Sequence, residues 1–257
     1  QITAALSKAR RPIAVIGDEA KWELTHGLEP AAVASAIERH RMLFTSLRHA
    51  RGFVDERHQL CCGPGGVSGN KTLQKAMGEA DVILLLGHHM ESDLGFGDDV
   101  NPEAVVVQSY PDTEFLGKNY RSDIVTTAGV GAVTEHLLSM PAMNTDQAWV
   151  EATAAEWRKE RTSQIAGNPD GPPLHPATVI DEVCDAMPDN SLYATGGGNV
   201  DFWVDGRLQV KSPNTYFKGG PGGAIGADVP YGVGARAADP GRPVVVLLGD
   251  GAFAYHG

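Results

Sequence analysis

The sequence predicts an α/β protein, with a doubly wound parallel sheet in a central domain and an incomplete second α/β domain after it. The first observation is that short apolar runs alternate with helical patterns over residues 1–140. The second is the run DVILLLG at 81–87, whose five consecutive apolar residues are typical of a strand covered on both faces. The third is a break at 168–173, NPDGPP, after which a shorter alternation begins. Such alternation implies parallel strands with right-handed crossovers.

The first unit, residues 1–140, is interpreted as a central Rossmann-like domain. Its helix at 30–40 carries Ala, Val and Ile on one face, as a helix that packs on a sheet requires. The expected strands are 12–17, 42–47, 81–87, 104–110 and 123–129, and the other expected helices are 70–80 and 130–140.

Residues 141–173 are interpreted as a helical segment and a linker. The pattern places Trp149, Ala152 and Trp157 on a shared face. Three prolines and a glycine at 168–173 then interrupt regular structure.

The second unit, residues 174–257, begins with an amphipathic helix at 175–188, with Pro176 near its start and Pro188 beyond its end. A strand within 191–199 leads into a glycine turn. Residues 215–239 are first glycine-rich and then helical, and 243–253 contain the last strand. Because no helix follows to cover that strand, the unit is expected to be the truncated first part of a domain, with an exposed apolar edge at 244–248.

Composition limits the classes of partner. The formal net charge of −11 and the lack of a basic stripe argue against a nucleic acid, and no run reaches the length of a membrane span. Three cysteines without a CxxC spacing predict no disulfide framework, which fits the cytoplasm. The chain begins with Gln1 and ends soon after an apolar strand, so we expect a fragment.

Three glycine turns in the second unit predict one anion site. They lie at 196–199, 219–223 and 249–251, each beside an expected strand or helix end. Ligands of parallel α/β sheets bind outside the carboxyl ends of strands, where helix N-termini offer free N–H groups. Asp250 adds a carboxylate suited to Mg²⁺ beside a phosphate, although an Asp-Gly turn alone is common in any protein. The GPGG sequence at 63–66 is interpreted as a plain loop.

Residues 219–253 resemble the diphosphate-binding domain of thiamine diphosphate enzymes, in the group of acetolactate synthase, benzoylformate decarboxylase and oxalyl-CoA decarboxylase. The resemblance rests on the glycine-rich loop, on the Pro-x-x-x-Gly-Ala pattern from Pro230 to Ala235 and on GDG after the next strand. Residues 9–20, 79–97 and 115–138 resemble the central domain of the same group.

The resemblance implies a 2-oxo-acid decarboxylase or carboligase that uses thiamine diphosphate and Mg²⁺. It assigns Asp250 to the metal, the N–H groups of Gly251 and Ala252 to the diphosphate, and the carbonyl of Gly223 to the aminopyrimidine. Ile225 would be the aliphatic residue that bends the cofactor into its V shape. The remaining residues expected at the cofactor are Gly197, Gly198, Asn199 and Gly249.

Two departures from the family pattern stand out. Val200 replaces a His that often lies beside the diphosphate, and His88-His89-Met90 replaces a common Ala-Arg, which puts FAD or nucleotide binding by the central domain in doubt. The two histidines are expected to face solvent or to cap a strand end. Cys61, Cys62 and Cys184 are expected to be packing residues.

No catalytic residue is expected within this chain. In the family the activating Glu lies in a preceding domain of a neighbouring subunit, and an Asn that completes the Mg²⁺ site would follow Gly257, so the fragment alone is expected to be inactive. The parent would be a homodimer or homotetramer that acts on a 2-oxo acid or acyl-CoA. Two alternatives remain: a nucleotide- or acyl-CoA-binding α/β protein, disfavoured by the acidic turn Gly17-Asp18-Glu19, and a non-catalytic paralogue.

Overall fold

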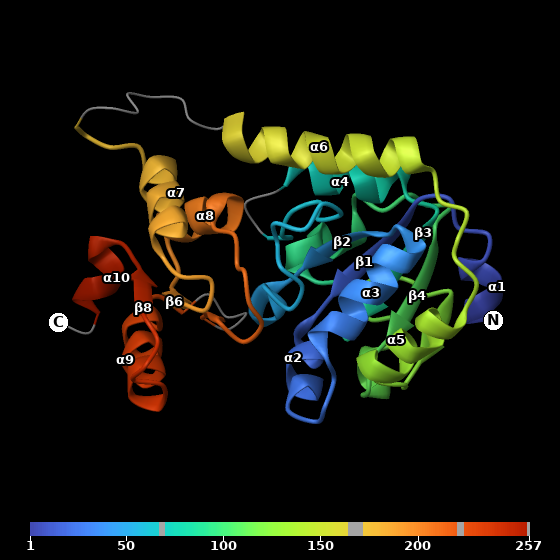
Figure 1. The fold of residues 1–257 in the computed structure, drawn as a ribbon, viewed down its shortest axis with the longest axis horizontal. Helices are drawn as coiled ribbons and strands as arrows, with labels where there is room; N and C mark the ends of the chain where they lie inside the picture. Colours follow the sequence, from blue (N-terminus) through green and yellow to red (C-terminus); the bar gives the residue numbers. More distant parts are fainter. Residues whose placement is uncertain (67–69, 164–171, 220–223, 256–257) are drawn as a thin grey trace.

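The computed structural model describes residues 1–66, 70–163, 172–219 and 224–255. It confirms the α/β class, with two parallel sheets in one chain (Figure 1). The first sheet has the strand order β2-β1-β3-β4-β5, and the second has the order β7-β6-β8. Within the described ranges, no helix is both long and apolar enough to cross a membrane.

The first sheet is built from β1 (Pro12–Ile16), β2 (Leu43–Ser46), β3 (Val82–Leu86), β4 (Val105–Ser109) and β5 (Ile124–Thr126). Every residue of β1, β2 and β3 is buried, which explains why these strands read as continuous apolar runs. The register is regular, with Val15 opposite both Thr45 and Leu85. All pairings are parallel, so the carboxyl ends of the five strands lie along one edge of the sheet.

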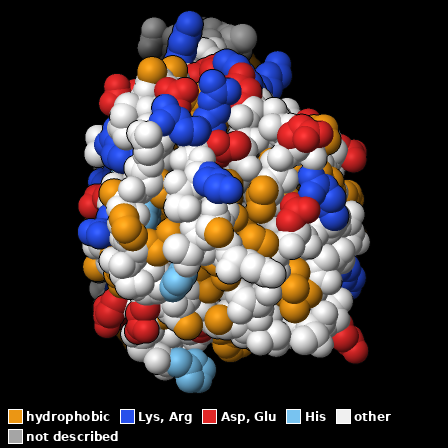
Figure 2. All heavy atoms as spheres, turned by 90° about the vertical axis from the view of Figure 1, so that its right-hand side faces the viewer, with side chains coloured by type: hydrophobic (Ala, Val, Ile, Leu, Met, Phe, Trp, Pro, Cys, Tyr) orange, Lys and Arg blue, Asp and Glu red, His pale blue; other side chains and the backbone are white. Residues whose placement is uncertain are grey.

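Helices cover both faces of this sheet (Figure 1). On one face, α3 (Pro30–His40) packs against α5 (Val130–Ser139), and α2 (Asp18–Leu24) also contacts α5. On the other, α4 (Lys71–Glu79) packs against the long helix α6 (Gln147–Ser163). The remaining elements of this unit are α1 (Ile2–Leu6) and the 3₁₀ turns η1 (Arg48–Ala50), η2 (Ser92–Gly97) and η3 (Thr113–Phe115). The face turned away from the second sheet carries acidic and basic side chains interspersed (Figure 2).

The buried face of α6 differs in one residue from the prediction. Trp149 and Trp157 are buried as expected, but Ala152 is exposed and Thr153 takes its place. The spacing of four residues from Trp149 to Thr153 and from Thr153 to Trp157 keeps one stripe on the helix, whereas Ala152 lies off it. The indole Nε1 of Trp149 donates to Glu79 Oε2 at 2.7 Å, so α6 is tied to the first unit.

The second unit contains α7 (Pro176–Ala186), β6 (Leu192–Thr195), α8 (Asn199–Arg207), β7 (Tyr216–Lys218), α9 (Asp228–Ala238), β8 (Val244–Leu247) and α10 (Asp250–Ala254). In this unit α7 packs on α8, and α9 packs on β6 and β8. Its core is small and includes Tyr193, Val204 and Tyr216. The edge strand β8 is half-buried at every residue.

Sequence reasoning missed α2, α8 and the strand β7. The first begins directly after β1, and α8 begins directly after the glycine turn that follows β6, where no helix was predicted. The two units touch closely around Gly52, where a Cβ atom would lie 2.5 Å from the carbonyl oxygen of Ser212. Gly52 also has a φ of +77°, a backbone conformation that favours glycine.

Candidate functional site

Two of the predicted glycine turns lie side by side because their strands are neighbours. Parallel pairing of β6 with β8 places Thr195 opposite Leu247, so both strands end at the same edge of the sheet. The chain leaves β6 through Gly196, Gly197 and Gly198 and enters α8, and it leaves β8 through Gly249 and enters α10. A Cβ atom on Gly249 would lie 3.7 Å from Val200 Cγ2, so the second turn lies beside the start of α8.

The space above these turns is open to a ligand. A Cβ atom placed on Gly198 or on Gly251 would meet no described atom within 4 Å. Gly198 has a φ of +99° and caps the start of α8, while Gly249 caps the start of α10. Helix N-termini leave N–H groups without partners inside the helix, and two of them open onto the same edge here. An anion can therefore approach the backbone of both turns.

The predicted metal-binding carboxylate is available to a cation. Asp250 is exposed at the first position of α10, and its Oδ1 accepts only a short-range bond from Gly251 N at 2.9 Å. No ion pair within the described ranges involves Asp250. Asn199 is likewise exposed at the first position of α8. The Asp250 carboxylate and the Asn199 amide are oxygen donors of the kind that Mg²⁺ prefers, and a phosphate bound at the turns would add more. Ala252, two residues after Asp250 in α10, is buried.

The third predicted turn is described only in part. Gly223 lies outside the described residues. Ile225 lies in a turn before α9 and is 45% exposed, and Gly226 follows it with a φ of +91°. The start of α9 reaches the β6 turn, because a Cβ atom on Gly196 would lie 2.2 Å from Asp228 Oδ2.

Asp228 is a residue that sequence reasoning missed. It is fully buried, its Oδ1 accepts from Val229 N at 2.9 Å, and its Oδ2 has no hydrogen-bond partner in the part of the chain described. The signal available in the sequence was an acidic residue two positions before Pro230, at the start of a helix. Gly196 is needed at this point because no side chain would fit against the carboxylate.

Lys218 holds one side of α8 in place. Its ammonium contacts Asp201 Oδ2 at 3.0 Å and Asp205 Oδ2 at 2.9 Å, one helical turn apart. Burial alone would lower the pKa of Lys218, but the neighbouring Tyr216, Asp205 and Asp201 raise it above its ordinary value. Thr195 Oγ1 also lies 3.1 Å from the Tyr216 hydroxyl, which links β6 to β7. These contacts fix the elements behind the glycine turn.

His88 and His89 were expected to face solvent or to cap a strand end, and the first of these alternatives is wrong. Both side chains are buried, 4% and 7% exposed, because the chain after β3 turns inward over the sheet edge. Burial lowers the pKa of His88 to about 3, so the imidazole is neutral. His89 Nε2 lies 2.5 Å from Glu91 Oε1. Among the described residues, no group of three or more His, Cys, Asp or Glu is arranged to hold a metal ion.

The corresponding edge of the first sheet is closed at its switch point. In the order β2-β1-β3-β4-β5, a ligand would be expected outside β1 and β3, where the strand order reverses. A Cβ atom on Gly17 would lie 2.4 Å from both the Gly87 carbonyl oxygen and His88 Cβ. Nearby, Arg48 forms ion pairs with Glu91 and Asp93. The two turns pack against each other and leave no room for a phosphate between them.

The cysteines are packing residues, as expected. Cys61, Cys62 and Cys184 are free and buried. Burial raises the pKa of the Cys62 thiol to about 12 and also raises those of Cys61 and Cys184. None is set up as a nucleophile, because the thiolate is the reactive form.

Comparisons with known proteins agree with the two-sheet architecture. Residues 1–137 match the family described as thiamine pyrophosphate enzyme, central domain, and residues 196–257 match thiamine pyrophosphate enzyme, C-terminal TPP binding domain. A probable acetolactate synthase of Mycobacterium bovis is 28% identical over 98% of this chain and 44% of its own length. An acetolactate synthase large subunit of Lactococcus lactis is 23% identical, and the isozyme 1 large subunit of Escherichia coli is 25% identical, each over 43% of its length. The matches cover 98% and 97% of this chain, so the chain spans less than half the length of these relatives.

Proposed function

The chain belongs to the thiamine pyrophosphate enzyme family, and from this we propose that it forms part of an acetolactate-synthase-like 2-oxo-acid decarboxylase or carboligase. Thiamine pyrophosphate, also called thiamine diphosphate, would be its cofactor, with Mg²⁺ as the counter-ion. The observation that carries this proposal is the parallel pairing of β6 with β8, which places the starts of α8 and α10 and the Asp250 carboxylate at one edge of the sheet.

The chain's own residues have binding and orienting roles in this proposal. Backbone N–H groups at the start of α10, from Gly251 and Ala252, would donate to the diphosphate, and Asn199 would approach it from α8. Asp250 would hold the cation that neutralises the same group. Gly197, Gly198 and Gly249 allow the backbone to come close because they carry no side chain.

The ring end of the cofactor would lie toward the loop before α9. There we assign the Gly223 carbonyl to the aminopyrimidine and the exposed side chain of Ile225 to the bend between the two rings. Bound thiamine diphosphate supplies the carbanion chemistry itself, and the protein supplies its position and surroundings. Val200 is uncharged and stands where the resembling enzymes often carry a His. The backbone N–H groups and the cation would therefore be the main partners of the diphosphate.

The substrate and assembly are proposed from the relatives. The relatives named above are acetolactate synthases, so a small 2-oxo acid is the substrate class we propose, with acyl-CoA as the alternative within the family group. We also propose a homo-oligomer, because the family resemblance assigns the activating Glu to a neighbouring subunit.

Calorimetry on the full-length polypeptide tests the proposed function. We expect thiamine diphosphate to bind only when Mg²⁺ is present, and we expect Asp250→Asn to weaken that binding by at least about tenfold, which corresponds to about 1.4 kcal/mol. Asp239→Asn is the matched control, since Asp239 is a half-exposed acidic residue at the far end of α9. Equal affinities for the wild type and Asp250→Asn would overturn the assignment.

A further inference from the structure

Helix α8 has one end at the candidate site and the other at the contact between the two units. Its first residue, Asn199, follows the glycine turn, and its last residue, Arg207, is buried and forms an ion pair with Asp181 of α7. A helix of nine residues is about 13 Å long and behaves as a rigid rod over that length. Whatever fixes the C-terminal end of α8 therefore also sets the position of the turn at its start.

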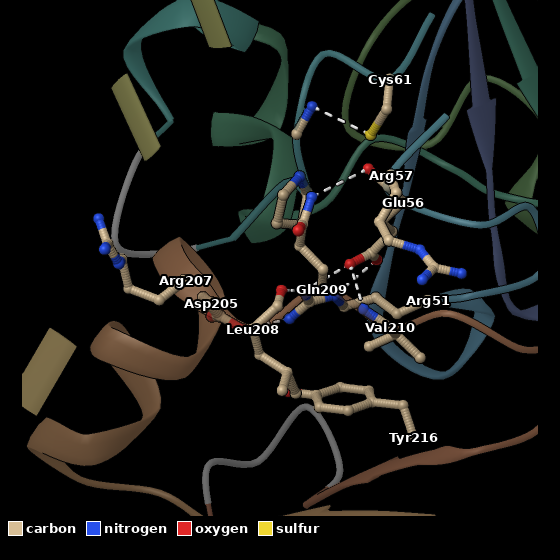
Figure 3. A network of polar contacts seen from close by, with 12 residues as sticks. Arg51, Glu56, Arg57, Cys61, Asp205, Arg207, Leu208, Gln209, Val210 and Tyr216 are labelled. Atoms are coloured by element: carbon tan, nitrogen blue, oxygen red, sulfur yellow. Dashed lines mark hydrogen bonds and ion pairs between the residues drawn. The ribbon is translucent and has the colours of Figure 1, made fainter. Parts of the chain in front are cut away.

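An arginine of the first unit binds the end of α8. Arg51 follows η1 and is 1% exposed. Its Nη2 donates to the carbonyl oxygen of Leu208, the residue that caps α8, at 2.5 Å. Its Nη1 lies 3.7 Å from Asp205 Oδ1, and its guanidinium stacks on the Tyr216 ring at 4.9 Å (Figure 3).

A second arginine binds the preceding carbonyl. Arg161, near the end of α6, donates through Nη1 to the Arg207 carbonyl oxygen at 3.1 Å and to Asp181 Oδ1 at 3.2 Å. The last carbonyls of a helix lack partners inside it and carry partial negative charge, so cations are favourable there. Both cations that cap α8 come from segments that precede the second sheet in the chain.

Glu56 orients the Arg51 guanidinium and joins the two backbones. It accepts from Arg51 Nε at 2.9 Å and from Arg51 Nη2 at 2.8 Å, a two-point contact between planar groups. Its Oε2 also accepts from Val210 N at 2.9 Å, and its own N–H donates to the Val210 carbonyl at 3.2 Å. The segment after α8 is thus held in one register against the first unit.

The buried ion pair between Arg51 and Glu56 is expected to add little to the stability of the fold. Desolvation of a buried ion pair offsets much of its attraction, and apolar replacements of similar size are often as stable. Arg51 Nη1 makes no hydrogen bond to any residue in the described ranges, which adds to the cost. Hydrogen bonds to the Leu208 carbonyl and from the Val210 N–H fix where α8 ends. Apolar side chains would not fix it, because apolar contacts are not directional.

We propose that Arg51, oriented by Glu56 and assisted by Arg161, is a positioning residue for the glycine turn that binds the diphosphate. This inference rests on the proposed function, since it gives that turn its ligand. Through α8, the first unit sets the position of Asn199 relative to the neighbouring turn at Gly249.

The test separates positioning from stability by removing both charges at once. Arg51→Met leaves Glu56 buried without its partner, and the double variant Arg51→Met, Glu56→Gln removes the remaining charge while the Gln amide oxygen still accepts from Val210 N–H. The control is Arg57→Met, which removes a different ion pair between the units, Arg57 with Asp189, at an exposed position. The readouts are thermal unfolding, amide hydrogen exchange of residues 199–207 in the cofactor-free protein, and affinities for thiamine diphosphate and for thiamine.

We expect the double variant to regain most of the stability that Arg51→Met loses. Its α8 amides should still exchange at least about tenfold faster than in the wild type, which corresponds to about 1.4 kcal/mol of local opening. Its affinity for thiamine diphosphate should fall about tenfold while its affinity for thiamine stays unchanged, since only the diphosphate contacts the turn. Arg57→Met should change none of these readouts.

Two results would overturn the inference. In one, the double variant has wild-type exchange in α8. In the other, it loses affinity for thiamine and thiamine diphosphate to the same extent. A wild-type protein that binds no thiamine diphosphate would overturn the proposed function and with it the ligand of the turn, and the exchange rates would then still show whether Arg51 holds α8.

Discussion

The packing of α9 on β8 predicts opposite effects for the same substitution at two glycines of one helix. Gly232 faces the sheet, and a Cβ atom there would lie 2.3 Å from Val246 Cγ2. Gly234 faces solvent, and a Cβ atom there would meet no described atom within 4 Å. We expect Gly232→Ala to destabilise the protein and Gly234→Ala to stabilise it.

The magnitude comes from separating two contributions. Alanine in place of glycine within a helix gains about 0.5–1 kcal/mol at either position, because it reduces the backbone freedom of the unfolded chain. At Gly232 the added methyl must also displace Val246, and overpacking of this kind costs about 1–3 kcal/mol. The helix contribution cancels in the comparison, so the two variants should differ by about 1–3 kcal/mol, or about 2–4 °C in melting temperature for each kcal/mol.

Urea unfolding followed by circular dichroism measures this difference in the free energy of unfolding. A Val246→Ala change should relieve most of the cost of Gly232→Ala, because it removes the methyl group that the new side chain would meet. If both glycine variants change the free energy of unfolding equally, α9 does not pack on β8 as described. The outcome bears on the site, since β8 delivers Gly249 and Asp250.

Two further predictions concern buried titratable groups in the first unit and in α7. His88 binds a proton below about pH 6.5 in the unfolded chain but only near pH 3 in the folded chain. The free energy of unfolding should therefore fall as the pH drops below 6.5, by at most about 1.4 kcal/mol per pH unit. His88→Gln should reduce that slope, which urea midpoints measured at several pH values would show, and an unchanged slope would contradict the burial of His88. Cys61, Cys62 and Cys184 should not react with a thiol reagent in the folded protein and should all react in denaturant, because burial raises their pKa values; rapid reaction of any of them in the native state would show that it is accessible.

The strands of the first sheet were predictable because burial on both faces leaves a direct trace in the sequence. β3 is buried at all five residues and reads as five consecutive apolar letters. Helix α8 left no such trace. Its buried face includes Asp205 and Arg207, whose partners Lys218, Arg51 and Asp181 lie elsewhere in the chain. A helix that buries charges against distant partners has no apolar stripe for a periodicity argument to detect.

The candidate site was predictable in outline for a related reason. Glycine turns directly after apolar strands indicate the carboxyl edge of a parallel sheet, and the pairing of β6 with β8 then brings two of them together. The amino-acid pattern does not reveal the order of strands, so it could not establish that Gly249 lies against Val200. Asp228 was missed because its burial depends on the docking of α9 against Gly196, which is a tertiary contact.

The carboxyl edges of the two sheets differ in the residue that follows a glycine at the end of a strand. After β3, Gly87 is followed by His88, whose side chain turns inward and packs against the Gly17 turn, so the switch point of the first sheet is filled by the protein itself. After β8, Gly249 is followed by Asp250, which points to solvent beside an open glycine turn. In the inference above, the first sheet acts on the site from outside, through Arg51 and the end of α8. A ligand that requires both edges would contradict this division, whereas substitutions at Arg51 that alter only diphosphate affinity would support it.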